Sequence, residues 1–114
     1  MAIEVNEPAL SYARDLIRRG KVVRDQRDWS EVAPTTQQEN EVIERDGWSE
    51  YARWHLGVDP SENPETKKAY SFPFGDFSEV HRSGVIAGES RAGQYHHTEV
   101  EAAFKSLLEL IDEG

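Results

Sequence analysis

Four histidines and their charged neighbours are the side chains of this sequence whose spacing could support chemistry. The imidazoles are His55, His81, His96 and His97. No two of them stand four positions apart with a glutamate next to the first, as in the HExxH motif that binds zinc. The sequence also contains no cysteine, which excludes thiolate ligands and a cysteine nucleophile. We therefore expect neither a metal site nor a cofactor.

A carboxylate–imidazole pair comes nearest to a catalytic group. Asp76 precedes His81 by five positions, and Ser83 follows closely. Catalysis would require the carboxylate to orient the ring and the ring to remove the hydroxyl proton. The sequence lacks a GxSxG turn, however, and Asp76 is explained as the N-cap of a helix. We predict no catalytic residue.

A short basic stretch interrupts a chain whose formal net charge is -9. Residues 18–27 contain one acid, Asp25, against five cations: Arg18, Arg19, Lys21, Arg24 and Arg27. This basic island could bind an anionic partner, but we favour neutralisation by the acidic remainder of the chain.

The excess of negative charge argues against nucleic acid as a partner, because binding to phosphates needs surplus lysine and arginine. The same charge repels anionic membranes. The sequence has no run of about 18 apolar residues, as a membrane span requires, and no signal peptide is evident at its start. We expect a cytoplasmic protein.

The periodicity predicts one mainly α domain over residues 1–114, with four or five helices. The first covers residues 7–19, with Asn6 as N-cap and Gly20 beyond its end. Thr36 and Glu39 have the spacing of a capping box that opens another helix. The Asp46-Gly47 pair breaks that helix, and residues 48–56 continue with helical spacing. One kinked helix remains possible for residues 36–56, although we favour two.

The second half of the chain combines an aromatic extended segment with a helical hairpin. Tyr70, Phe72 and Phe74 alternate with other residues, and Pro73 favours an edge strand or extended strap. Two further capping-box pairs are predicted to open the last two helices: Asp76 with Glu79, and Thr98 with Glu101. We expect these helices to pack antiparallel through residues 95–97, with the glycines and alanines of 84–93 allowing close approach.

Three phrases of the sequence resemble a family of small uncharacterised bacterial proteins. They are Tyr51-Ala-Arg-Trp-His-Leu-Gly-Val-Asp59, Tyr70-Ser-Phe-Pro-Phe-Gly-Asp-Phe77 and Val80-His-Arg-Ser-Gly-Val-Ile86. The resemblance covers roughly residues 29–112. It implies no activity, cofactor or catalytic residue for this chain, because the family has none assigned.

Two functional hypotheses follow. The first is a non-enzymatic cytoplasmic interaction or accessory domain that binds another protein, through its acidic face or an aromatic patch. The second is a small-molecule-binding protein or enzyme, in which Arg82 would bind an anionic group and a histidine would move a proton. The candidate binding residues for the two are His55, Trp48, Phe74, Asp76, His81 and Arg82. Mimicry of nucleic-acid charge is a third possibility, and the oligomeric state stays open.

Overall fold

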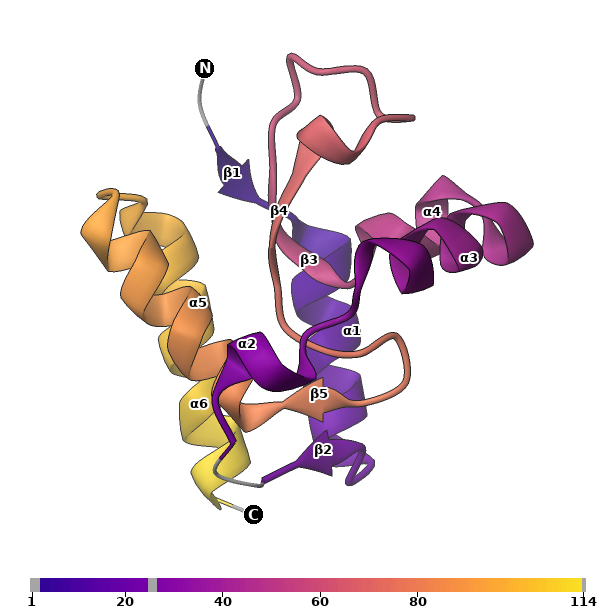
Figure 1. The fold of residues 1–114 in the computed structure, drawn as a ribbon. Helices are drawn as coiled ribbons and strands as arrows, with labels where there is room; N and C mark the ends of the chain where they lie inside the picture. The colour runs from indigo at the N-terminus through magenta and orange to yellow at the C-terminus, as the bar shows by residue number, and fades with distance from the viewer. Residues whose placement is uncertain (1–2, 25–26, 114) are drawn as a thin grey trace.

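The computed structural model describes residues 3–24 and 27–113 and is mainly helical (Figure 1). These residues form six α-helices: α1 (Glu7–Arg18), α2 (Trp29–Val32), α3 (Thr36–Asp46), α4 (Trp48–Ala52), α5 (Arg82–Gln94) and α6 (Thr98–Glu113). They also form a short 3-10 helix and five strands: η1 (Lys67–Ala69), β1 (Glu4–Val5), β2 (Val22–Val23), β3 (His55–Val58), β4 (Tyr70–Pro73) and β5 (Val80–His81). The helix count exceeds the predicted four or five because α2, about one turn long, lies where no helix was predicted.

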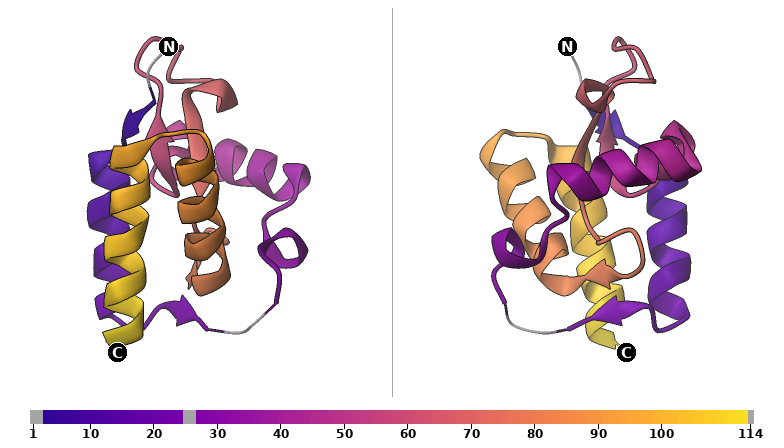
Figure 2. Two further views of the ribbon diagram at one scale, coloured as in Figure 1. Left: turned by 90° about the vertical axis from the view of Figure 1, so that its left-hand side faces the viewer. Right: turned by 45° about the vertical axis from the view of Figure 1, so that its right-hand side comes forward.

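Three long helices form the frame of the molecule. α6 packs against both α1 and α5, and it runs antiparallel to α5, as the predicted hairpin requires (Figures 1 and 2). In the left view of Figure 2, α1 and α6 lie side by side. The strands β3 and β4 pack across this layer, whereas α3 and α4 lie to one side of it.

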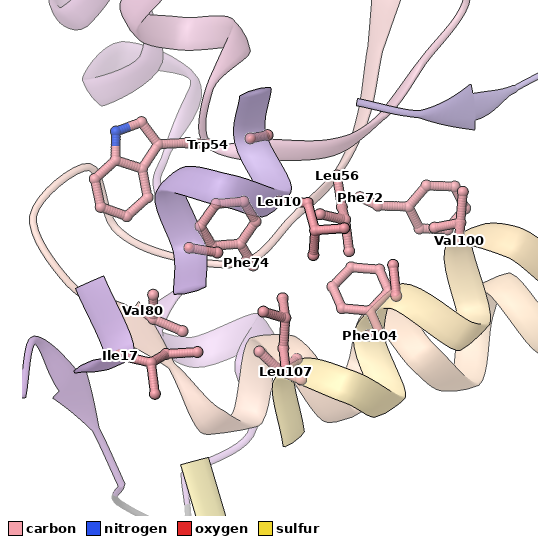
Figure 3. Close-up of a cluster of buried hydrophobic side chains, with 14 of the residues drawn as sticks. Leu10, Ile17, Trp54, Leu56, Phe72, Phe74, Val80, Val100, Phe104 and Leu107 are labelled. Atoms are coloured by element: carbon pink, nitrogen blue, oxygen red, sulfur yellow. The ribbon is translucent and has the colours of Figure 1, made fainter. Parts of the chain in front are cut away.

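The buried apolar side chains form one cluster between the helical layer and the sheet (Figure 3). α1 contributes a stripe at helical spacing and α6 a second one, as their sequences predict. Phe74 and Phe104 are fully buried within the cluster. A Cβ placed on Gly88 of α5 would overlap the ring of Phe104. The close approach of the two helices therefore depends on that glycine.

Two small sheets hold distant parts of the chain together. The order of the larger is β1-β3-β4, with antiparallel pairing, so β4 is an edge strand as Pro73 predicts. In the smaller, β2 pairs in parallel with β5, and Val22 lies opposite Val80. The segment after α1 thus contributes a two-residue strand.

The predicted ends of the first helices need correction. α1 ends at Arg18, and Asn6 occupies the N-cap position without a side-chain cap. Its Nδ2 instead donates to the carbonyl oxygens of Ala52 and His55, at 3.0 Å each. Asn6 thus holds α1 to the segment between α4 and β3 instead of capping α1 with its side chain.

The segment from 36 to 56 consists of two helices followed by a strand. The capping box lies one residue earlier than predicted and joins Thr35 to Gln38. Gly47, with φ of 88°, separates α3 from α4. α4 ends at Ala52, so His55 belongs to β3 and not to a helix, because β3 gains the antiparallel pairing with β4.

The two capping boxes predicted for the last helices were wrong. Asp76 Oδ1 accepts from the main-chain N–H groups of Ser78 and Glu79, but in a turn before β5 and not at a helix start. Phe77 in this turn has φ of 69°, which a helix does not allow. α5 begins only at Arg82. In α6, Thr98 is the first helical residue and not the cap before it.

A Schellman motif ends α5 in the connection between α5 and α6. The N–H of His96 donates to Gly93, and the N–H of His97 donates to Ala92. His96 adopts the left-handed conformation, with φ of 62°, at the position where glycine is usual. The turn thus has the standard hydrogen bonds but an unfavourable residue.

Candidate functional site

His55 is a buried structural histidine. Only 3% of the residue is exposed, its Nδ1 lies 2.8 Å from the carbonyl oxygen of Tyr51, and its ring stacks on the Tyr51 ring at 4.3 Å. Burial lowers the pKa of His55 to about 4, although the hydrogen bond to Tyr51 opposes this change. Burial, and then the nearby Glu39 carboxylate, raises the pKa of Tyr51 to about 12. Both rings are therefore neutral at pH 7.

Asp76 and His81 form the expected pair. His81 Nε2 lies 2.9 Å from Asp76 Oδ2, and the His81 ring packs 5.6 Å from the ring of Trp29. Burial raises the pKa of Asp76, but hydrogen bonds from His81, Glu79 and Ser78 outweigh it and leave that pKa below its usual value. The pair fixes the turn between β4 and β5.

Two buried polar atoms near this pair have no hydrogen-bond partner within the described residues: His81 Nδ1 and Ser83 Oγ. A catalytic triad would require the free imidazole nitrogen to accept from the serine hydroxyl. No hydrogen bond joins them. The arrangement is thus a carboxylate–imidazole pair without a connected nucleophile.

The six candidate binding residues do not converge on one hollow. His55 lies among Tyr51 and Tyr70, whereas His81 lies against Trp29. Neither imidazole lines the hollows that open between α2 and α5 or between β1 and α6.

The candidates Phe74, Trp48 and Arg82 also lie in three different environments. Phe74 is fully buried, and the half-buried Trp48 packs edge-on against Tyr51. Arg82 does line a hollow, and its guanidinium also pairs with Asp112, at 2.9 Å between Nε and Oδ1. Of the six, Arg82 thus lies where a ligand could reach it.

The basic island is partly neutralised within the chain. Arg19 pairs with Asp15 at 3.0 Å, and Arg24 Nη2 donates to the Ile111 carbonyl oxygen at the C-terminal end of α6. The island's acid, Asp25, lies outside the described residues. Arg27 lines the hollow next to α2.

The most distinctive surface feature is a groove between α2 and α5, which we call the α2–α5 groove. It consists of two hollows of about 460 Å³ each that share four lining residues: Asp28, Trp29, Ala87 and Ser90. Ile86 lines one hollow and is 41% exposed, which makes it one of two large apolar side chains exposed in the described chain. The other is Tyr95, which lines neither hollow.

A further hollow of about 630 Å³ opens between β1 and the start of α6. Its lining is largely polar and includes three glutamates and two histidines: Glu4, Glu7, Glu99, His96 and His97. Across residues 3–24 and 27–113, no group of three or more acidic or histidine side chains is arranged to hold a metal ion.

Comparisons with protein-family models, with curated proteins and with solved structures gave no match. The resemblance to small bacterial proteins thus gains no support from a family model. In the part of the chain that the structure describes, no helix has the length and apolar character to span a bilayer.

The groove residues were missed in the sequence, because the small residues of α5 were attributed to helix packing alone. Gly88 does pack against α6, but Ala87 next to it faces the groove. The groove joins residues some 60 positions apart, and no local pattern reports such a contact.

Proposed function

We propose that this chain is a non-enzymatic protein-interaction domain of the cytoplasm that binds a partner protein through the α2–α5 groove. The observation that carries the proposal is the exposure of Ile86 beside Trp29. A concave surface lined by apolar and aromatic side chains with a few polar groups is a frequent place for binding. The cysteine-free composition fits a reducing compartment.

The environment of the histidines supports a role without catalysis. His81 is 6% exposed and His55 is 3% exposed, so neither ring has the access to substrate that proton transfer needs. The hydrogen-bond partner of the His55 ring is a main-chain carbonyl group. The partner of the His81 ring is the Asp76 carboxylate, which also accepts from the main-chain N–H of Glu79. Both imidazoles stabilise the fold next to β4.

Affinity capture with matched variants tests the proposal. Ile86→Glu puts a charge into the groove, whereas Tyr95→Glu makes the same kind of change at an exposed site outside it. We expect wild type and Tyr95→Glu to capture the same protein in a stoichiometric amount from native extract. Ile86→Glu should capture at least tenfold less of it. Equal capture by all three proteins would rule out the groove as the binding site.

Small-molecule binding is a second candidate, favoured by the unsatisfied hydroxyl of Ser83. Ser83 lines the same hollow as Arg82, and its buried Oγ has no hydrogen-bond partner among residues 3–24 and 27–113. A carboxylate or phosphate could take both groups as donors. Thermal unfolding with inorganic phosphate and with small carboxylic acids tests this function. A rise in Tm for wild type that is lost in Ser83→Ala would support it, and no rise with any of these probes would exclude these anions.

A further inference from the structure

We infer that α2 is a strap that opens and closes over the start of α5, and that one side chain, Trp29, holds it closed. Opening gives water access to His81 and Ser83, whose buried polar atoms lie next to α2. Three features of the structure support this movement: the sparse attachment of α2, the close fit of its tryptophan, and the polar atoms beside that ring. The movement needs no partner in the α2–α5 groove.

α2 is attached to the rest of the molecule by few contacts. It is four residues long and packs beside the start of α5 (Figure 1). None of its side chains is buried, and none belongs to the buried apolar cluster or packs against it. Within the described parts of the chain, no hydrogen bond or ion pair joins residues 28–34 to another segment. A segment with so few contacts opens at a much lower free energy than the whole domain unfolds.

The ring of Trp29 is the exception, because it has a defined seat on α5. It packs on Gly84, where an added Cβ would come within 3.0 Å of the ring. It also lies against the ring of His81, with 5.6 Å between the two ring centroids. One side chain with a close-fitting seat gives α2 a single closed position. Loss of this contact therefore releases the whole turn.

Two polar atoms next to this seat lack hydrogen bonds while the strap is closed. An ionised Asp76 carboxylate can only accept, so Nε2 of His81 donates to it and Nδ1 of the neutral ring is left as an acceptor. Neither this Nδ1 nor Ser83 Oγ has a partner among the described residues. Burial of a polar group without a partner is unfavourable, and water reaches both atoms when α2 opens. Both atoms therefore favour the open state.

The two states present different surfaces to solvent. In the closed state the Asp76–His81 pair is shielded, and α2 forms one wall of the α2–α5 groove. In the open state that wall is absent, and the imidazole nitrogen and the serine hydroxyl are accessible. If the groove binds a protein as proposed above, the partner therefore holds the strap closed, because it binds only that state.

Chemical modification of the histidines tests the strap. Diethyl pyrocarbonate acylates a neutral imidazole nitrogen that solvent reaches, and mass spectrometry of the full chain at neutral pH gives the rate at each ring. His81 and His55 are similarly buried, at 6% and 3% exposure, but His55 lies among Tyr51 and Tyr70. Its rate therefore reports unfolding of the domain. We expect His81 to react at least about tenfold faster than His55 in the wild type.

Trp29→Ala removes the side chain that holds the strap closed. It should raise the rate at His81 by about tenfold or more and leave the rate at His55 unchanged. Trp48→Ala is the matched control, because Trp48 is also half-buried but packs on Tyr51 instead of His81. It should leave the rate at His81 unchanged.

Ser83→Ala shifts the strap in the opposite direction, because it removes one of the two unpaired polar atoms. The rate at His81 should fall about fivefold. Ser90→Ala is the control on the same helix, at an exposed position. It removes a hydroxyl that water reaches in either state, so the rate at His81 should stay the same.

Equal rates at His81 and His55 in the wild type would overturn the strap, because both rings would then be exposed only by global unfolding. A rise at both histidines in Trp29→Ala would overturn it as well, since Trp29 would then hold the whole fold together. Unchanged rates in both Trp29→Ala and Ser83→Ala would have the same meaning. A fast reaction at His81 together with equal capture of a partner by Ile86→Glu would keep the strap and reject the groove as the binding site.

Discussion

Asn6 and His55 lie 49 positions apart, and Nδ2 of Asn6 donates to the main-chain carbonyl oxygen of His55 across 3.0 Å. The same nitrogen donates to the carbonyl of Ala52, and the Asn6 N–H donates to Leu56. One asparagine thus ties the start of α1 to the junction between α4 and β3.

Asn6→Asp should destabilise the fold by about 3 kcal/mol, because it removes two donors and places a carboxylate beside two carbonyl oxygens. Urea unfolding measures the change. Asn40→Asp on the exposed face of α3 is the control, and it should shift the free energy of unfolding by less than about 0.5 kcal/mol. Equal effects of the two changes would show that Asn6 has no such connecting role.

The free energy of unfolding should fall as the pH decreases from 6.5 towards 4. The reason is that the pKa of His55 is about 4 in the folded chain and 6.5 in the unfolded chain. In this window the unfolded state binds the proton and the folded state does not. The difference between the two pKa values corresponds to about 3 kcal/mol, present above pH 6.5 and lost below pH 4.

His55→Phe should flatten this part of the stability profile. The phenyl ring keeps the stacking on Tyr51, and the Tyr51 carbonyl oxygen still accepts from the N–H of Trp54. Urea unfolding at several pH values measures both proteins, and the carboxylates common to them cancel in the comparison. Parallel profiles between pH 6.5 and 4 would contradict a neutral, buried His55.

Gly88→Ala should destabilise the protein by about 2 kcal/mol, because the added methyl overlaps the Phe104 ring where α5 meets α6. Gly93→Ala, on the same helix, is the matched control. There the methyl meets only the flexible end of the Glu101 side chain, and alanine's higher helix propensity should leave stability unchanged or slightly raised. Thermal unfolding distinguishes the two. Equal Tm values would mean that α5 and α6 are not in close contact at Gly88.

His96→Gly should stabilise the chain by about 0.5–1 kcal/mol, because glycine adopts the left-handed conformation of this position without strain. His96 is exposed, so little packing is lost. The Tm should rise by a few degrees. The same change at His97, which packs against Phe72, should lower the Tm instead.

Local periodicity was sufficient to predict α1 and α6. Leu10, Ala13 and Leu16 in α1, and Phe104 and Leu107 in α6, lie at helical spacing, and all of them are buried in the common cluster. Each of these helices has one apolar face. That face predicts a helix whichever part of the chain comes to cover it. Amphipathic helices of this length can therefore be predicted from the sequence.

The turn at Asp76 shows why a capping pattern can mislead. An aspartate that accepts from main-chain N–H groups two and three residues ahead makes the same contacts in a turn as at a helix start. The pairing of Val80 and His81 with Val22 and Val23 decides between the two structures. That pairing crosses more than half of the chain, and the local sequence carries no sign of it.

The place of His55 in a strand and the existence of the groove were missed for the same reason. His55 follows Trp48 at helical spacing, yet its pairing opposite Pro73 makes it the first residue of β3. Trp29 and Ile86 meet only after α2 packs on α5. Both features arise from contacts between segments far apart, which residue types and local spacing do not encode.

The central place of α6 among the three long helices also constrains how this protein can be made in a cell. Ribosomes synthesise α6 after every segment that it covers, and α6 supplies the buried Phe104, Leu107 and Ile111 to the common core. A nascent polypeptide that ends before these residues leaves the apolar sides of α1, α5 and the sheet open to water. Completion of this fold therefore has to wait until α6 has been synthesised, and until then these apolar sides are open to chaperones.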